Sequence, residues 1–264
     1  MIEHTIRIIP RLDVKNNTVV KGIHLEGLRV VGTPAELARK YYLAGADELL
    51  YMDAVASLYE RNSLKDIIEK TAQEVFIPLT VGGGIRTLED IKTILRAGAD
   101  KVAINTAAIR RPEFIKEAAN RFGSQCIVAS IEAKKIGADR WEAYVETGRQ
   151  STGVDAIEWA KRLVQLGAGE LLVTSIDREG TKKGLEIDLI KKISQIVPIP
   201  VIACGGVGQP THMVDLLKTA DVSAIACASI LHYNLSDITS IKQYLGQQGS
   251  RVRKFNESAQ ASYH

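Results

Sequence analysis

The sequence lacks any apolar stretch near the roughly 20 residues that a helix needs to cross a membrane. One of its longer apolar runs, from Ile199 to Cys204, leads directly into glycines. Net charge is also small, because 34 Lys and Arg residues face 31 Asp and Glu residues, a formal balance of +3 with neutral histidines. Lysines and glutamates are interleaved and form no basic block. Because nucleic acids and anionic membranes bind concentrated basic surfaces, we expect neither as a partner.

Cysteine is scarce, and its three residues lie inside apolar runs at long, irregular spacing: Cys126, Cys204 and Cys227. This spacing is unlike a disulfide framework or a zinc ligand set, so we expect reduced core cysteines, no metal and no other cofactor. The N-terminal segment carries charges on both sides of a short apolar core and lacks the regions of a secretion signal. We therefore expect a cytoplasmic location.

Short apolar runs rich in β-branched residues alternate with amphipathic stretches, a pattern typical of repeated βα units with parallel strands. Each apolar run is followed by an expected loop and helix. Eight candidate strands lie near residues 6–13, 48–53, 76–81, 101–105, 126–131, 170–175, 200–204 and 222–227. Capping chemistry predicts helix starts at Thr33-Pro34 and at Thr87.

The second half of the sequence repeats the first. Gly45 corresponds to Gly167 and Ile77 corresponds to Ile199, an offset of 122 residues in both cases. A constant offset over many residues indicates an internal structural repeat. Each half therefore contains four βα units.

When two such halves are joined edge to edge, they close a single (β/α)8 barrel of the α/β class. The expected halves are about 1–123 and 124–247. A polar tail follows, about 248–264. The alternative is a doubly wound sheet. It is disfavoured because the turn after Asp13 has no glycine-rich dinucleotide fingerprint, and the glycines at 82–84 alone would be a weak one.

Two carboxylates end opposite strands of the expected barrel. Asp13 ends the first strand and Glu132 ends the fifth, and the repeat relates their positions. Active sites of such barrels form on the loops that follow the strand C-termini. Strands one and five face each other across an eight-stranded ring, so both carboxylates point into one mouth. They form a candidate acid/base pair, with capping of loop amides as the alternative.

Two sets of residues at strand ends, again related by the repeat, combine glycines with small residues after the next strand. The first cradle is Gly82, Gly83, Gly84, Asn105 and Thr106, and the second cradle is Gly205, Gly206, Ala228 and Ser229. Glycines let backbone N–H groups approach an anion closely. Two anion sites on opposite sides of a mouth predict a substrate with a phosphate at each end, unless the glycines only make tight turns.

Two further segments supply candidate binding residues. Lys21 lies on an expected loop after the first strand, where it can hold a phosphate or a developing negative charge, or simply be solvated. The segment 177–182, after the sixth strand, is polar, glycine-hinged and long enough to cover a ligand, and contains Glu179, Gly180 and Thr181. No histidine lies at a strand end, and His232 is predicted to be a packed helix residue.

Charged residues of alternating sign also mark the opposite face of the expected barrel, near the strand N-termini. This set, the floor ring, is Arg7, Glu48, Lys101 and Glu170. Salt bridges among them would close the barrel floor. Residues on this face of a barrel usually serve stability.

Ordered motifs from residue 6 to about 245 are similar to one family. They include IIPRLDVK at 8–15, TVGGGIR at 80–86, FGSQ at 122–125, GAGE at 167–170 and TSIDR at 174–178. The sequence resembles HisF, the family of cyclase subunits of imidazole glycerol phosphate synthase. The related sugar-isomerase barrel of histidine synthesis shares the two-phosphate pattern, but the motifs at 122–125 and 167–170 favour HisF.

The resemblance implies a lyase that adds ammonia, released from glutamine by a separate HisH-like glutaminase, to a bis-phosphorylated aminoimidazole carboxamide ribonucleotide. It implies Asp13 and Glu132 as general acid and general base, in roles that could be reversed. The floor ring becomes the gate through which ammonia enters, with a glutaminase docked on that face as a heterodimer. The implied phosphate sites are Gly84, Asn105, Thr106, Gly180, Gly206, Ala228 and Ser229.

The sequence departs from the family pattern near the mouth. Glu132 and Glu179 stand where the family has Asp, Arg11 replaces a commonly small residue, and the loop 57–63 is rewritten. A misplacement of about 1 Å can cost on the order of 100-fold in rate. Two alternatives follow: a paralogue that supplies ammonia to a sugar of surface polysaccharides, or a weakly catalytic barrel that binds and activates a glutaminase.

Overall fold

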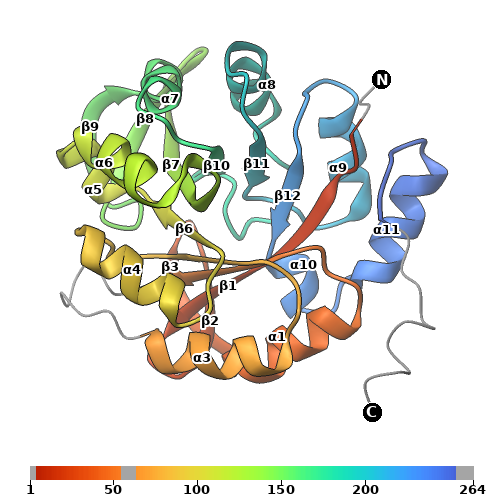
Figure 1. Cartoon of the computed structure of the whole chain (residues 1–264). Coiled ribbons are helices and arrows are strands. Elements are labelled where there is room, and N and C mark those ends of the chain that lie inside the picture. Colours follow the sequence, from red (N-terminus) through yellow and green to blue (C-terminus); the bar gives the residue numbers. More distant parts are fainter. Residues whose placement is uncertain (1–3, 55–63, 254–264) are drawn as a thin grey trace.

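The computed structural model describes residues 4–54 and 64–253, and within them parallel strands close into a ring surrounded by helices (Figure 1). The last strand of the ring pairs with the first, which leaves no free edge. The strands, in ring order, are β1 (Arg7–Lys15), β4 (Leu49–Asp53), β5 (Leu79–Gly82), β6 (Lys101–Ile104), β7 (Ile127–Gly137), β10 (Glu170–Ser175), β11 (Val201–Cys204) and β12 (Ala224–Cys227). The predicted (β/α)8 barrel is therefore confirmed, and the doubly wound alternative is wrong.

Helices follow the ring strands and cover the outside of the barrel (Figure 1). They are α1 (Pro34–Leu43), α3 (Lys65–Glu74), α4 (Leu88–Arg96), α6 (Glu113–Phe122), α7 (Ala156–Gln165), α8 (Ile187–Ile196), α9 (Pro210–Leu217) and α11 (Ile238–Gln247). A short 3-10 helix, Ser124–Cys126, leads into β7. In the part of the chain that the structure describes, no helix is long and apolar enough to span a bilayer.

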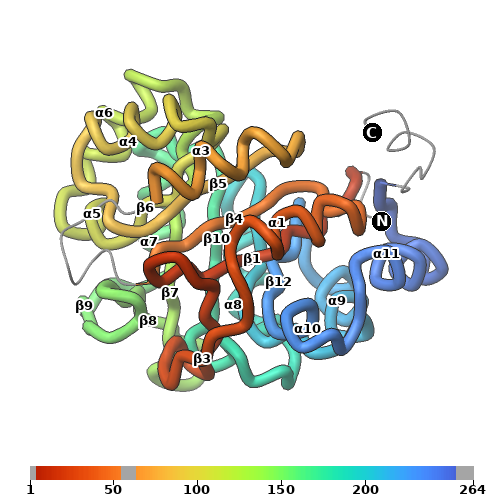
Figure 2. The backbone as a smooth tube through the Cα atoms, turned by 90° about the horizontal axis from the view of Figure 1, so that it is seen from below, coloured from red at the N-terminus to blue at the C-terminus, as the bar shows by residue number. Residues whose placement is uncertain are grey.

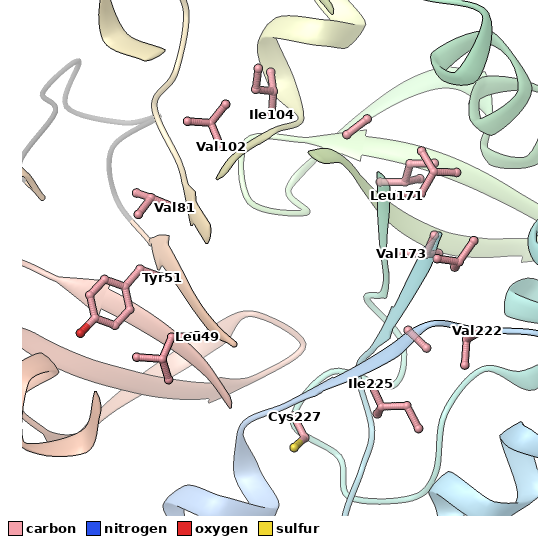
Figure 3. Close-up of a cluster of buried hydrophobic side chains, with 14 of the residues drawn as sticks. Leu49, Tyr51, Val81, Val102, Ile104, Leu171, Val173, Val222, Ile225 and Cys227 are labelled. Carbon is pink, nitrogen blue, oxygen red and sulfur yellow. The ribbon is translucent and has the colours of Figure 1, made fainter. Parts of the chain in front are cut away.

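Side chains alternate between the two faces of each ring strand, as the pleat of a β-strand requires. Leu49, Tyr51 and Ile225 point outward and pack against the helices, and Figure 3 shows them directed away from the centre of the ring. Their neighbours Leu50 and Ala224 fill the barrel interior in a second apolar cluster. Complete burial of a Leu or Ile side chain contributes roughly 1.5–3 kcal/mol, so these two layers stabilise the fold.

Two hairpins at the mouth were not predicted. After β1 the chain forms β2 (Thr18–Ile23) and β3 (Glu26–Gly32), and after β7 it forms β8 (Arg140–Val145) and β9 (Gln150–Asp155). The expectation that a loop and then a helix follow every strand is wrong at these two places. Figure 2 shows both hairpins at one end of the molecule.

Short helices also follow two ring strands, since α5 (Thr106–Arg110) comes after β6 and α10 (Ser229–His232) comes after β12. The hairpins come after the first and fifth ring strands and the short helices after the fourth and eighth, so the mouth carries the same additions in both halves. The half-barrel boundaries stay a prediction. Of the C-terminal tail, the structure describes 248–253, where Val252 forms a parallel bridge with Ile6.

The predicted helix starts have mixed outcomes. Thr87 forms a capping box, because its Oγ1 accepts from the Asp90 amide at 3.1 Å and the Asp90 carboxylate accepts from the Thr87 amide at 2.9 Å. Pro34 begins its helix as predicted, but Thr33 does not cap it. The Thr33 hydroxyl instead donates to the Glu36 carboxylate at 2.6 Å. The loop 57–63 lies outside the described residues.

Candidate active site

A cavity of about 260 Å³ opens at the mouth of the barrel, where the ring strands end. Asp13 on β1 and Glu132 on β7 both line it, from opposite positions in the ring. Both residues are almost completely buried, with exposed fractions of 6% for Asp13 and 5% for Glu132. The structure thus brings the two predicted carboxylates into one cavity.

Neutral donors hold the Glu132 carboxylate. Asn105 Nδ2 donates to Glu132 Oε2 at 3.0 Å and also to the carbonyl oxygen of Tyr144 at 3.0 Å. The backbone amide of Gly148 is a further donor. Burial raises the pKa of Glu132 to about 7, even though the positive charge of Arg11 opposes this rise.

Cations hold the Asp13 carboxylate. Arg11 Nε donates to Asp13 Oδ1 at 2.8 Å, and Lys21 Nζ lies 3.4 Å from Asp13 Oδ2. Burial alone would raise the pKa of Asp13, but the Arg11 and Lys21 charges outweigh it and hold that pKa below its ordinary value. The two candidate catalytic carboxylates therefore differ in their preferred protonation state.

The first cradle forms one side of the 260 Å³ cavity, which Gly83, Gly84, Asn105 and Thr106 all line. Gly83 has a positive φ of 100°, and a Cβ there would lie 2.8 Å from the Cβ of Asp53. Any side chain at this position would therefore collide with the end of β4. Asn105 Oδ1 is buried and accepts no hydrogen bond within the described residues, which leaves one polar atom unsatisfied beside the cradle.

The second cradle lines a separate cavity of only about 10 Å³, together with Glu179 and Gly180. Gly206 has a positive φ of 99°, and a Cβ there would overlap the carbonyl oxygen of Gly184. The hydroxyl of Ser229 is buried and has no hydrogen-bond partner in residues 4–54 and 64–253. An unsatisfied buried hydroxyl beside glycine amides is suited to an anionic oxygen.

Lys21 lies in β2, so the expected loop position is wrong, as is the alternative of a solvated side chain. Its side chain is buried because β2 pairs with β1, and Lys21 Nζ forms a short ion pair with Glu179 while also contacting Asp13. The tip of the β2–β3 hairpin contacts the loop after β10 as well, since the His24 amide donates to the Glu179 carbonyl oxygen at 2.8 Å. Gly180 packs against Gly22, and a Cβ on Gly180 would overlap the Gly22 carbonyl oxygen. The hairpin and the loop after β10 therefore contact each other beside the second cradle.

Thr181 is not brought to either cradle. Its Oγ1 donates to the Arg178 carbonyl oxygen at 2.7 Å, within the same loop, and it lines a different surface pocket. The prediction of Thr181 as a binding residue therefore has no geometric support, because the hydroxyl is used to hold the turn of its own loop.

The floor ring closes the opposite end of the barrel. Arg7 pairs with both Glu48 and Glu170, and Lys101 Nζ lies 3.3 Å from Glu48 Oε2 and 3.0 Å from Glu170 Oε2. Each cation thus bridges the same two carboxylates. The predicted salt-bridged floor is confirmed, whereas its role as an ammonia gate stays a prediction.

The sequence marks Arg11 as a departure from the family pattern, but its contact with Asp13 was not predicted, although the residue pattern carries a signal for it. Ile9, Arg11 and Asp13 alternate along β1, and this period of two places all three on the inner face. His232 packs in α10 as predicted. Its Nδ1 lies 2.7 Å from the Tyr41 hydroxyl, and its Nε2 lies 3.0 Å from the Arg11 carbonyl oxygen. Burial, together with the Lys21 charge, lowers the pKa of His232 to about 4.

The three cysteines are free thiols; Cys204 and Cys227 are buried, whereas Cys126 is only partly covered. Among the described residues, no group of three His, Cys, Asp or Glu side chains is placed to hold a metal ion.

A closed barrel with two buried carboxylates at its mouth has the form of a (β/α)8 barrel enzyme. The family described as "Histidine biosynthesis protein" matches residues 7–237. The chain is also 51% identical, over 247 residues, to the imidazole glycerol phosphate synthase subunit HisF of Bacillus cereus (strain G9842). That alignment covers 94% of this chain and 98% of the relative. The chain therefore belongs to the HisF family of histidine biosynthesis proteins.

Proposed function

We propose that the chain is a lyase that uses ammonia to convert a bis-phosphorylated aminoimidazole carboxamide ribonucleotide into imidazole glycerol phosphate. The observation that carries the proposal is the pair Asp13 and Glu132, which line one 260 Å³ cavity from opposite strands. General acid–base catalysis needs one group that accepts a proton and one that donates it within reach of the same substrate. The different charge environments of these carboxylates meet that need.

The cradles would hold the two phosphates of this substrate. In the first cradle Gly83 and Gly84 line the cavity without side chains, so a ligand can approach their backbone closely. In the second cradle the Ser229 hydroxyl is available as a donor. Lys21 would add a positive charge between Asp13 and the second cradle, where Glu179 now pairs with it. Binding at the second cradle would require Glu179 to shift, because the space there is about 10 Å³.

Ammonia would enter through the floor ring from a HisH-like glutaminase docked below it. Exposed apolar side chains lie on that side of the barrel, just before strand N-termini: Leu43 is 43% exposed and Phe76 is 70% exposed. Apolar residues beside a ring of charges are suited to a protein interface with an apolar centre and a polar path through it. The heterodimer is part of this proposal.

An ammonia-driven cyclase assay on the purified chain tests the activity directly. The bis-phosphorylated substrate is supplied with ammonium salt, and product formation is followed for the parent and for Glu132→Asp. Turnover by the parent supports the proposal and makes glutamate a competent residue at this position. If the parent is inactive and Glu132→Asp restores turnover, the longer side chain of Glu132 prevents turnover of this substrate, and the site serves another acceptor.

A second candidate is ammonia transfer to a phosphorylated or nucleotide-linked sugar. It is favoured by the small second cavity and by Arg11, which fills space beside Asp13 at the deep end of the mouth. Ammonia consumption with sugar acceptors but not with the bis-phosphorylated substrate would select it. Glu132→Gln distinguishes a weakly catalytic barrel from an enzyme. If the chain is only a scaffold, the variant should still stimulate a glutaminase. If the chain is an enzyme, the variant should lose product formation.

A further inference from the structure

Arg11 lies inside the barrel, and its exposed fraction is only 2%. Besides the bond to Asp13 on its own strand, Arg11 Nη1 donates to Thr174 Oγ1 on β10 at 3.2 Å and to Cys204 Sγ on β11 at 3.5 Å. The side chain therefore crosses the interior from β1 to the other half of the barrel. Three contacts on three strands hold the guanidinium in one orientation.

A guanidinium is charged at every pH at which proteins are folded. At 2.8 Å from Asp13 and away from water, it favours the ionised carboxylate much more strongly than an exposed pair would. Lys21 adds a second positive charge at 3.4 Å and shares it with Glu179. His232 also faces Asp13, and its Nε2 lies 3.0 Å from the Arg11 carbonyl oxygen. Within the described residues Glu132 has no cation among its hydrogen-bond partners and is held by amide donors. Positive charge is thus concentrated on one of two otherwise similar acids.

We propose that Arg11 is a positioning residue that fixes Asp13 as the base and leaves Glu132 as the acid. This inference rests on the proposed function. The nitrogen of ammonia sheds a proton as it gains a bond to carbon, and the Asp13 carboxylate accepts this proton. The nitrogen of the leaving aminoimidazole carboxamide ribonucleotide keeps the electron pair of its broken bond to carbon and takes a proton from the Glu132 carboxyl group. One proton is accepted and one is donated, so the two carboxyl groups exchange protonation states in each turnover and are reset through solvent.

The family resemblance left the two roles reversible, with Asp13 as the acid in the first assignment, and the order proposed here is the reverse of it. The pH dependence of activity distinguishes a purely structural role for Arg11 from the proposed role. If Arg11 only braces β1 against β10 and β11, its removal would lower activity by the same factor at every pH. If it fixes the protonation state of Asp13, its removal would move the acidic limb of the pH–rate profile.

The first experiment is a site-resolved ¹³C NMR titration of the carboxyl groups of Asp13 and Glu132 in the folded chain. In the parent, Asp13 should titrate at a lower pH than Glu132. Arg11→Met keeps the length of the side chain without its charge and should raise the Asp13 midpoint by about 1–3 pH units. Arg11→Lys should restore most of the shift. Arg39→Met, which removes an exposed cation on α1, is the matched control.

The second experiment is the pH profile of ammonia-driven turnover for the same proteins. We expect the acidic limb of Arg11→Met to move toward neutral pH and that of Arg11→Lys to return. A uniform loss with an unmoved limb would overturn the proposal, as would a parent in which Asp13 titrates above Glu132. The parent titration needs no variant, so the inference is testable even if Arg11→Met does not fold. Absence of turnover in the parent would refute the proposed function. The NMR titration needs no turnover, so it tests the effect of Arg11 on Asp13 separately.

Discussion

Replacement of Glu132 by Gln should stabilise the protein at alkaline pH. The carboxyl group of Glu132 is buried, and no cation in residues 4–54 or 64–253 bonds to it directly. Its pKa of about 7 in the folded chain lies above the ordinary value of 4.5. Gln keeps nearly the same shape and can still accept the Asn105 hydrogen bond, but it never has to lose a proton in a buried site.

The sign and size follow from linkage. Because the folded-state pKa is raised, the folded chain binds more protons than the unfolded chain between pH 4.5 and about 7, and stability falls as pH rises through this window. A shift of about 2.5 units corresponds to ~3 kcal/mol of unfolding free energy. This penalty is absent at acidic pH, grows up to about pH 7 and is then constant. Glu132→Gln avoids it.

Urea unfolding of the parent and of Glu132→Gln, measured from pH 4 to pH 8.5, checks this reasoning. The stability difference should move in favour of the variant by ~3 kcal/mol between the two ends of the range. Glu117→Gln removes one negative charge on the exposed surface of α6 and serves as the control. If the difference in unfolding free energy between the parent and Glu132→Gln is the same at all pH values, burial does not disfavour ionisation of Glu132 and the reasoning is refuted.

Three other changes have definite expected outcomes. Gly206→Ala would force a Cβ into the Gly184 carbonyl oxygen at a φ of 99°, so thermal unfolding should show a lower midpoint and inorganic phosphate should protect the variant less than the parent. Thr87→Ala removes the hydroxyl of a capping box and should cost about 1 kcal/mol in urea unfolding, and an unchanged midpoint would count against the cap. Arg7→Met removes the ion pairs of Arg7 with Glu48 and Glu170 and so opens the floor ring. With a HisH-like glutaminase present, the ratio of glutamine-driven to ammonia-driven turnover should change. An unchanged ratio would argue against passage of ammonia through the floor ring.

Much of the fold could be predicted because it depends on local patterns. Strands read from short apolar runs agree closely with the structure, and the run 170–175 matches β10 (Glu170–Ser175) at both ends. The hairpins were not predicted because β2 and β8 pair with β1 and β7, and their own hydrophobic patterns do not indicate strands. The β3 segment, for example, has mostly exposed or half-exposed residues and no clean alternation.

The sequence by itself determined the barrel, its internal repeat and the two carboxylates at the mouth, because strand periodicity, glycine placement and repeat spacing are properties of the chain read in order. It did not determine that β1 and β7 continue past these carboxylates to Lys15 and Gly137. Only the tertiary structure decided how the two carboxylates differ. Lys21 meets Glu179 across 158 positions of sequence, and Arg11 meets Thr174 across 163. Contacts at such separations exist only once the barrel has closed, and in its water-poor interior they decide which carboxylate holds its proton.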